Sequence, residues 1–394
     1  MNELYELPEG WEWKKLKDTI EFSNKTVIID NDDEYNCIGL EHIESNTGKL
    51  IDFKTSHGLD IKSSKVVFEK GMVLYSKLRP YLNKVWKAEF SGIATTEILP
   101  FKPFPDVLDS NYLAHYLRSN YFVQNAMNNI SGARMPRITT RYLKNDALIP
   151  LPPLQEQKRI VAKLDALFEK IDKAIALHQK NMDEADAFMG SVLNDVFGEL
   201  KEQYSPMKRF DTYTSLSRGH NPPKKDFIYE KKDGYVRFIQ IRDGSSDKNV
   251  VYVPITKKLH LVTKNDLLLV AYRQVGKVFR NMEGAFNVAL CKIVNNDKSS
   301  LDTTYLYYLI QSKYVKDELL KRSERALIPS MSIEHLKSIK IPIPPLKIQQ
   351  KTVNYLDKIS LHVKRVKELQ KEKMQHLKAL KASILDQAFR GKLN

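Results

Sequence analysis

The sequence predicts an α/β (α+β) protein with two globular domains joined by two long antiparallel coiled-coil helices and a pseudo-two-fold internal repeat. Three observations lead to this prediction. The segment Ile149-Pro-Leu-Pro-Pro-Leu154 recurs 192 residues later as Ile341-Pro-Ile-Pro-Pro-Leu346. Each copy precedes a long stretch without proline that carries apolar residues at helical spacing. Each copy also follows a segment of mixed strand and helix pattern.

Further matches between the two halves occur in the same order along the chain. Residues 191–197 (Ser-Val-Leu-Asn-Asp-Val-Phe) correspond to residues 383–389 (Ser-Ile-Leu-Asp-Gln-Ala-Phe), again 192 residues apart. This period exceeds that of solenoid repeats, so each repeat is a domain with an appended helix. The expected organisation is a globular domain at 1–150, a helical spacer at 151–198, a second globular domain at 199–341 and a second helical spacer at 342–394.

Both globular segments contain short strand patterns followed by a helical pattern. In the first, residues 65–68, 72–75 and 85–86 predict strands and residues 108–126 predict a helix. In the second, strands are predicted at 250–253, 267–272 and 288–294, and a helix at 301–320. Strand order stays open at this point, because periodicity does not reveal which strands pair.

The two spacers are predicted to be long helices that pack against each other. Pro150, Pro152 and Pro153 end the preceding segment, and the next proline is Pro206. Because helix one leads to the second domain and helix two starts there, the second helix must run back to pack on the first. The expected contact positions recur at the same displacement and are Leu164, Ile171, His178, Ala185 and Val192 with Leu356, Val363, Gln370, Leu377 and Ile384. His178 and Gln370 are expected either to meet in the middle or both to face solvent.

The composition indicates a protein that binds a polyanion. The 394 residues include 63 Lys and Arg against 48 Asp and Glu, which gives a net charge of +15 and a pI near 9.4. Nucleic acid or an anionic membrane surface fits this charge. No apolar run approaches the ~20 residues of a membrane span, and the first ten residues lack a signal-peptide pattern, so we expect a cytoplasmic location. Two cysteines exclude a disulfide framework and a zinc site.

The positive charge is concentrated in the second half. Residues 1–150 carry 19 basic and 20 acidic residues, whereas residues 199–341 carry 26 and 16. The first domain must therefore bind a polyanion through local loops, while the second can add general phosphate attraction.

Basic residues cluster in loop-like segments of both domains. The candidate DNA-binding residues are Lys77, Arg79, Lys84, Arg134, Arg137, Arg141, Arg218, His220, Lys224, Lys225, Arg273, Gln274, Lys277, Arg322 and Arg325. Arg79 and Arg273 occupy corresponding positions, which favours binding over solvated surface charge.

No catalytic residues and no metal site are predicted. Asn221-Pro-Pro-Lys224 is similar to the Asn-Pro-Pro-aromatic signature of adenine methyltransferases, but Lys224 replaces the aromatic residue, so a turn is the better interpretation. The chain has no Gly-x-Gly loop for a methyl-donor cofactor and no phosphate-binding Gly-x-x-x-x-Gly-Lys loop. Its histidines lack the spacing of metal ligands.

The chain resembles the specificity subunit of type I restriction–modification systems over essentially its full length. The residues that carry the resemblance are Leu7-Pro-Glu-Gly-Trp11, the repeated Pro-Pro-Leu junction with Gln155-Glu-Gln157, and the closing Ala388-Phe-Arg-Gly-Lys-Leu393. The second junction departs from this pattern, because it reads Leu346-Lys-Ile-Gln-Gln350.

The resemblance implies two target-recognition domains, at 1–150 and 199–341, each of which reads one half of a split double-stranded DNA sequence. It implies conserved helical spacers that hold these domains apart and dock two methyltransferase subunits. S-adenosylmethionine is expected on those subunits and no cofactor on this chain, and restriction/translocase subunits complete the complex. Two alternatives stay open: a self-sufficient DNA adenine methyltransferase, which would bind the cofactor alone, and a basic scaffold protein, which would select no DNA sequence.

Overall fold

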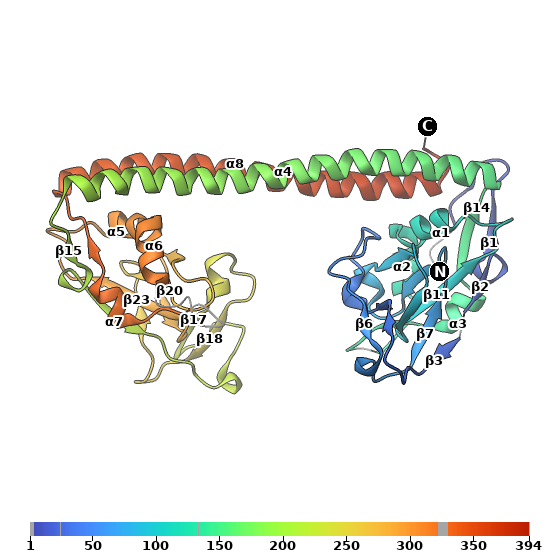
Figure 1. Cartoon of the computed structure of the whole chain (residues 1–394), viewed down its shortest axis with the longest axis horizontal. Helices are drawn as coiled ribbons and strands as arrows, with labels where there is room; N and C mark the ends of the chain where they lie inside the picture. The colour runs from blue at the N-terminus through green and yellow to red at the C-terminus, as the bar shows by residue number, and fades with distance from the viewer. Residues whose placement is uncertain (1–3, 24, 133, 322–329, 394) are drawn as a thin grey trace. The chain divides into compact units, whose positions relative to one another are not determined.

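The computed structural model describes residues 4–23, 25–132, 134–321 and 330–393. The chain divides into two compact units, one formed by Met1–His178 with Glu372–Asn394 and the other by Gln179–Lys371. Two long helices, α4 (Leu154–Gln203) and α8 (Leu346–Phe389), each contribute one part to each unit (Figure 1). Every unit therefore contains one globular domain and a segment of both long helices.

The domain of unit 1 is built on two four-stranded sheets. One has the order β2-β11-β8-β9 and the other β3-β7-β10-β5, and the smaller pairs are β1-β14, β4-β6 and β12-β13. The strands are β1 (Glu12–Lys15), β2 (Ile20–Phe22), β3 (Thr26–Val27), β4 (Glu34–Tyr35), β5 (Cys37–Ile38), β6 (Ser56–His57), β7 (Lys65–Phe68), β8 (Val73–Ser76), β9 (Val85–Lys87), β10 (Gly92–Thr95), β11 (Ile98–Pro103), β12 (Ile130–Ser131), β13 (Arg137–Ile138) and β14 (Leu148–Leu151). Its helices are α1 (Ser110–Leu117), α2 (Asn120–Met127) and α3 (Thr140–Asn145), and its 3-10 turns are η1 (Leu16–Asp18), η2 (Leu40–His42), η3 (Gly58–Asp60) and η4 (Pro80–Leu82).

The domain of unit 2 repeats this plan. Its sheets have the orders β16-β23-β20-β21 and β18-β17-β22-β19, and β15 pairs with β24 as β1 does with β14. In both domains one sheet contains a single parallel pair, β10 with β5 and β22 with β17. The strands are β15 (Lys208–Arg209), β16 (Thr214–Arg218), β17 (Tyr235–Ile239), β18 (Val251–Pro254), β19 (Leu261–Val262), β20 (Leu267–Val270), β21 (Val278–Phe279), β22 (Gly284–Phe286), β23 (Leu290–Asn295) and β24 (Lys340–Ile341). The helices are α5 (Thr303–Gln311), α6 (Lys313–Leu320) and α7 (Ile333–Ser338), and the 3-10 turns are η5 (Phe210–Thr212), η6 (Lys224–Asp226) and η7 (Ile241–Gly244).

The prediction of a single helix before each proline-rich junction is wrong. Residues 110–127 form two helices, because Ser119 adopts an extended backbone and its hydroxyl accepts a hydrogen bond from the Phe122 amide as the N-cap of α2. Ser312 breaks the equivalent region of unit 2 and caps α6 through the Val315 amide. Serine favours such a cap because its side chain replaces the missing backbone acceptor of the first helical turn.

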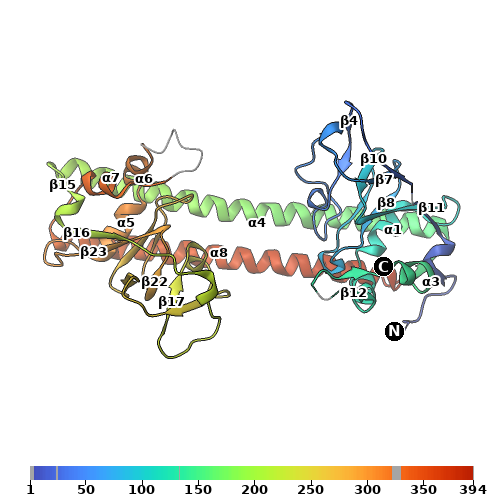
Figure 2. The same ribbon diagram turned by 90° about the horizontal axis from the view of Figure 1, so that it is seen from below.

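Within each unit the two long helices run antiparallel. In unit 1, Lys381 Nζ of α8 lies 2.7 Å from an Asp172 carboxylate oxygen of α4. In unit 2, Lys367 of α8 pairs with Asp186 of α4. Figure 2 shows the two helices from below.

Each domain packs its aromatic helix face on these helices. In unit 1, Tyr112 and Tyr116 of α1 lie against Phe389 near the end of α8, with ring centroids 5.1 and 5.2 Å apart. In unit 2, Tyr305 of α5 contacts Phe197 of α4 at 5.4 Å. All five rings are fully buried. The corresponding residues Phe197 and Phe389 thus close equivalent cores, although they come from different long helices.

The ten predicted helix contact positions are all at least partly shielded from solvent. Leu164, Ile171, Val192 and Leu356 are buried, and the other six are partly buried, namely His178, Ala185, Val363, Gln370, Leu377 and Ile384. Leu164 and Ile384 belong to the core of unit 1, and Val192 and Leu356 belong to that of unit 2. The pairing of His178 with Gln370 would join the two units and stays a prediction.

Candidate nucleic-acid interface

In unit 1, the loop between β8 and β9 presents an exposed arginine on a fixed backbone. Arg79 has a left-handed backbone conformation, with φ 51°, which costs energy for a residue with a side chain. Its amide donates a hydrogen bond of 2.6 Å to the Pro136 carbonyl, and Leu78 forms a β-bridge with Arg137. The segment leading into β13 therefore braces the loop, while the Arg79 side chain is exposed.

In unit 2, the loop between β20 and β21 repeats this arrangement. Arg273 is also left-handed, with φ 64°, and exposed. The Met331 amide donates to the Ala271 carbonyl at 2.9 Å, and Tyr272 forms a β-bridge with Ser330. The Arg273 guanidinium lies 5.9 Å from the centre of the Tyr272 ring. Both domains thus hold one arginine in an unfavourable backbone conformation at the same loop.

Several predicted DNA-binding residues have partners inside the protein. The Arg137 guanidinium donates to both carboxylate oxygens of Glu97, which raises the pKa of Arg137 and fixes its side chain. Lys84 donates to the Leu40 carbonyl, and Lys77 is partly buried beside the Arg79 loop. The side chains of Arg137 and Lys84 are therefore held by partners within unit 1, whereas Lys77 is partly buried.

Unit 2 also contains predicted DNA-binding residues whose side chains have partners within the protein. Arg218 of β16 donates to the carbonyls of Met331 and Val288. Lys277 Nζ lies 3.2 Å from the Ser245 hydroxyl and 5.5 Å from the centre of the Phe279 ring. Arg218 thereby joins β16 to the segment that braces the Arg273 loop.

The remaining predicted side chains are available to a ligand. They are exposed and make no hydrogen bond or ion pair with any residue the structure describes: Arg79, Arg134, Arg141, His220, Lys224, Lys225, Arg273 and Gln274. Arg141 lies on α3, which packs against η1. Arg322 and Arg325 lie outside the described residues. An exposed guanidinium on a fixed loop can donate paired hydrogen bonds to phosphate or to base edges.

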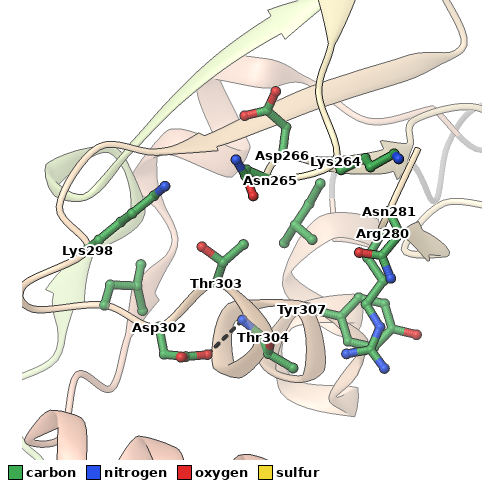
Figure 3. A pocket seen from close by; sticks show the side chains of 12 residues that line it. Lys264, Asn265, Asp266, Arg280, Asn281, Lys298, Asp302, Thr303, Thr304 and Tyr307 are labelled. Atoms are coloured by element: carbon green, nitrogen blue, oxygen red, sulfur yellow. Dashed lines mark hydrogen bonds between the residues drawn. The ribbon is translucent and has the colours of Figure 1, made fainter. Parts of the chain in front are cut away.

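A polar pocket in unit 2 is bordered by basic side chains, but the helix N-terminus beside it is already capped by a side chain of this chain. Lys264, Arg280 and Lys298 border it near the start of α5 (Figure 3). The Asp302 carboxylate accepts hydrogen bonds from the Thr304 and Tyr305 amides at 2.7 and 2.8 Å, which satisfies the helix terminus. Nothing in this arrangement forms a nucleophile–base pair.

The described residues contain no group of three metal-ligating side chains. Asn221, in the segment similar to a methyltransferase signature, accepts a hydrogen bond from the Val288 amide at 3.2 Å and so anchors its own loop. In the part of the chain that the structure describes, no helix has the length and apolar content for a membrane crossing.

Both units expose apolar side chains on their long helices. In unit 1, Leu177 is 58% and Leu380 is 49% exposed. In unit 2, the residues 192 positions away from them, Leu369 and Phe188, are 56% and 55% exposed. Exposed apolar groups therefore recur at corresponding positions of the two long helices. Unit 2 adds Tyr355, Leu361 and Val366.

Sequence reasoning missed one functionally placed residue in each copy of the junction. Gln157 and Gln349 are fully buried at the start of α4 and α8. Their side chains are hydrogen-bonded to the segment before α1 or α5. Their retention at a displacement of 192, while Glu156 is replaced by Ile348, is the signal that could have identified them.

Comparison with known proteins agrees with this duplicated architecture. The family model described as type I restriction modification DNA specificity domain matches residues 8–181 and again 214–375. The putative type I restriction enzyme MjaX specificity subunit of Methanocaldococcus jannaschii is 26% identical over 433 residues, covering 99% of this chain and 95% of its own length.

Two Escherichia coli relatives match over shorter segments. The type I restriction enzyme EcoDI specificity subunit is 31% identical over 51% of this chain, and the EcoAI specificity subunit is 26% identical over 54%. The chain spans less than half of the length of these two relatives, 45% and 36% respectively.

A solved structure gives the same result for the fold. A chain from work on complex assembly and conformational transition of the type I R-M system superposes with a TM-score of 0.73 and 25% identity, covering 99% of this chain and 100% of that chain. With both halves matched by one family model, the chain belongs to the family of type I restriction modification DNA specificity domain proteins.

Proposed function

We propose that this chain is the DNA sequence-specificity subunit of a type I restriction–modification complex. Each globular domain binds one half of a bipartite, non-palindromic double-stranded DNA site. The chain itself is non-catalytic, and methylation and cleavage belong to partner subunits. The observation that carries this proposal is the pair of exposed arginines, Arg79 and Arg273, held left-handed in equivalent loops of two different domains.

The two loops support recognition of two different half-sites. The loops share the position of the arginine, but Arg79 is followed by Pro80-Tyr81 and Arg273 by Gln274-Val275. Arginine reads guanine edges in pairs of hydrogen bonds, whereas glutamine can read adenine. Two readers with different side chains select two different sequences, so the combined site is not a palindrome.

The long helices support a docking role for methyltransferase subunits. Each unit exposes apolar side chains at corresponding positions of its long helices, Leu177 and Leu380 in unit 1 and Leu369 and Phe188 in unit 2, which fits two copies of the same partner. S-adenosylmethionine would be bound by that partner, since the sequence of this chain has no Gly-x-Gly loop for a methyl-donor cofactor. Restriction/translocase subunits would join the same complex.

The test is to map methylated adenines across the genome in cells that contain the methyltransferase subunit, with and without this chain. We expect methylation at one split sequence only when the chain is present. The isolated chain is expected not to bind S-adenosylmethionine in a calorimetric titration. Methylation without this chain, or cofactor binding by the chain alone, would support a self-sufficient methyltransferase instead. A complex that methylates no defined sequence would support the scaffold alternative.

A further inference from the structure

A buried histidine in unit 1 connects the long helix α4 to the globular domain. His115 of α1 is 5% exposed, and its Nε2 lies 2.8 Å from the Asp165 carboxylate of α4. Its Nδ1 lies 2.9 Å from a guanidinium nitrogen of Arg118. Because a guanidinium only donates hydrogen bonds, Nδ1 must be the acceptor and Nε2 carries the proton. The imidazole is therefore neutral and held by a partner on each side.

Arg118 extends this connection toward the Arg79 loop. Its guanidinium donates to the carbonyls of Thr47 at 2.6 Å and Ala114 at 3.1 Å. Its own carbonyl accepts a hydrogen bond of 2.9 Å from the side-chain amide of Asn83. The same Asn83 nitrogen donates to Asn46 Oδ1 at 3.1 Å, and the Asn46 amide donates to the Asn83 carbonyl at 3.0 Å.

Asn83 closes the turn that begins with Arg79. Both residues have left-handed backbones, with φ 51° for Arg79 and 50° for Asn83. The Asn83 amide donates to the Pro80 carbonyl, and the Leu82 amide donates to the Arg79 carbonyl. Asn83 is 8% exposed, so its two side-chain hydrogen bonds are shielded from water. The turn that carries Arg79 is therefore hydrogen-bonded, through the Asn83 side chain, to Arg118 and Asn46.

We infer that Asp165, His115, Arg118 and Asn83, together the Asp165 network, are positioning residues that set the aim of Arg79 at its DNA half-site. This inference rests on the proposed function. The network runs without a gap from α4, through α1, to the turn that carries Arg79. His115 and Asn83 are buried and Arg118 is partly buried, so these three members act on DNA only through the position of Arg79.

Unit 2 lacks this network at the corresponding positions. His115, Arg118 and Asn83 are replaced there by Tyr308, Gln311 and Gly276, each 193 residues further on. Asp357, the counterpart of Asp165, accepts a hydrogen bond of 2.6 Å from the Tyr308 hydroxyl.

Gly276 has φ +91° and no side chain that could hold the Arg273 loop. Disrupting the Asp165 network should therefore alter recognition of one half-site and leave the other as an internal standard.

The decisive variant is Asn83→Gly, tested in the full complex with its methyltransferase subunit. Glycine can adopt the left-handed turn, as Gly276 does in unit 2, and lacks the side chain that makes the hydrogen bonds. A randomised plasmid library is methylated in cells, and base preferences at both half-sites are read by sequencing. We expect roughly tenfold weaker discrimination at the half-site that Arg79→Ala identifies, in keeping with the loss of one base contact. The other half-site should be unchanged.

Two further variants distinguish positioning from general damage. Asn83→Asp has nearly the same shape but lacks the donor nitrogen, so it should reproduce the loss. Asn281→Gly is the matched control, because Asn281 is an exposed left-handed asparagine of unit 2, with φ 60°, and it should change neither half-site. Unchanged discrimination in Asn83→Gly, or equal loss at both half-sites, would overturn the inference. A wild-type complex that methylates no split sequence would instead overturn the proposed function.

Discussion

Gln157 and Gln349, 192 residues apart, make the same three hydrogen bonds in the two halves of the chain. The Gln157 Oε1 accepts from the Asp109 amide at 2.9 Å, and its Nε2 donates to the carbonyls of Val107 and Pro152. Gln349 repeats this with the Asp302 amide and the carbonyls of Ser300 and Pro344. In each unit, one buried glutamine side chain therefore links the start of the long helix to the proline-rich junction before it and to the residues at the start of α1 or α5.

Replacing Gln157 by alanine should weaken the attachment of α4 to its domain. The substitution leaves one backbone donor and two backbone acceptors without a partner, and we expect a loss of about 2–3 kcal/mol in unfolding free energy. Hydrogen exchange should show faster exchange of the Asp109 amide and of the amides of the first turn of α4. Gln155→Ala is the matched control, because Gln155 is an exposed glutamine on the same turn. An equal effect of both substitutions would contradict this role.

Phe389 should contribute to the stability of unit 1, although it lies near the end of the chain. It is 1% exposed and contacts Tyr112 and Tyr116. Phe389→Ala removes a large buried ring and should cost about 3–5 kcal/mol, measured by denaturant unfolding. Phe188→Ala, which truncates a ring that is 55% exposed, should change stability by less than about 0.5 kcal/mol. If Phe188→Ala lost as much stability as Phe389→Ala, burial of the Phe389 ring would not explain its contribution to the stability of unit 1.

The same exposed residues should matter for partner binding. Leu369→Ser and Phe188→Ala together remove the apolar pair of unit 2, and Leu177→Ser with Leu380→Ser removes that of unit 1. Each double variant is expected to lose one of the two methyltransferase copies, which the mass of the purified complex will report. Retention of two copies in both double variants would place the docking surface elsewhere.

Unit 1 should lose stability as the pH falls below neutrality. Burial lowers the pKa of His115 from its usual 6.5, the positive charges of Arg118 and Lys381 lower it further, and the Asp165 carboxylate opposes them. A histidine with a lowered pKa stabilises the fold while it is neutral, above the unfolded pKa. That contribution is lost as the pH falls through the window between about 6.5 and the folded pKa.

The expected slope is at most about 1.4 kcal/mol per pH unit in that window. Thermal unfolding between pH 5 and 8 will measure it, with His115→Gln as the comparison, since glutamine does not titrate. A wild-type profile parallel to that of His115→Gln would show that His115 is not the responsible group.

The duplication and the long helices could be predicted from the sequence because they depend on local signals. The repeated Pro-Pro-Leu segments and the apolar spacing in 154–203 indicate helix and repeat without reference to distant residues. The break at Ser119 was missed, although a serine three residues before Phe122 is a recognisable cap signal. Because apolar residues keep a helical spacing on both sides of Ser119, periodicity alone indicates one uninterrupted helix.

The partners of the site residues could not be predicted, because they come from distant parts of the chain. Arg137 is bonded to Glu97, and Lys84 to Leu40, and neither partner is near in sequence. The left-handed conformation of Arg79 is equally invisible in the sequence, since the Arg79 amide bonds to the carbonyl of Pro136, which is distant in the chain. Sequence reasoning therefore identifies the loops that carry charge, whereas the structure shows which charges remain exposed.

The most direct test of two independent readers is to map methylated sequences for Arg79→Ala and Arg273→Ala complexes in parallel. Each substitution should relax base preference by about 1–3 kcal/mol at one half-site, and the two variants should affect opposite half-sites. Arg159→Ala, which removes an exposed arginine of α4 paired with Glu156, serves as the control and should change neither. Relaxation of both half-sites by either loop variant, or of the same half-site by both, would contradict the assignment of one reader to each domain.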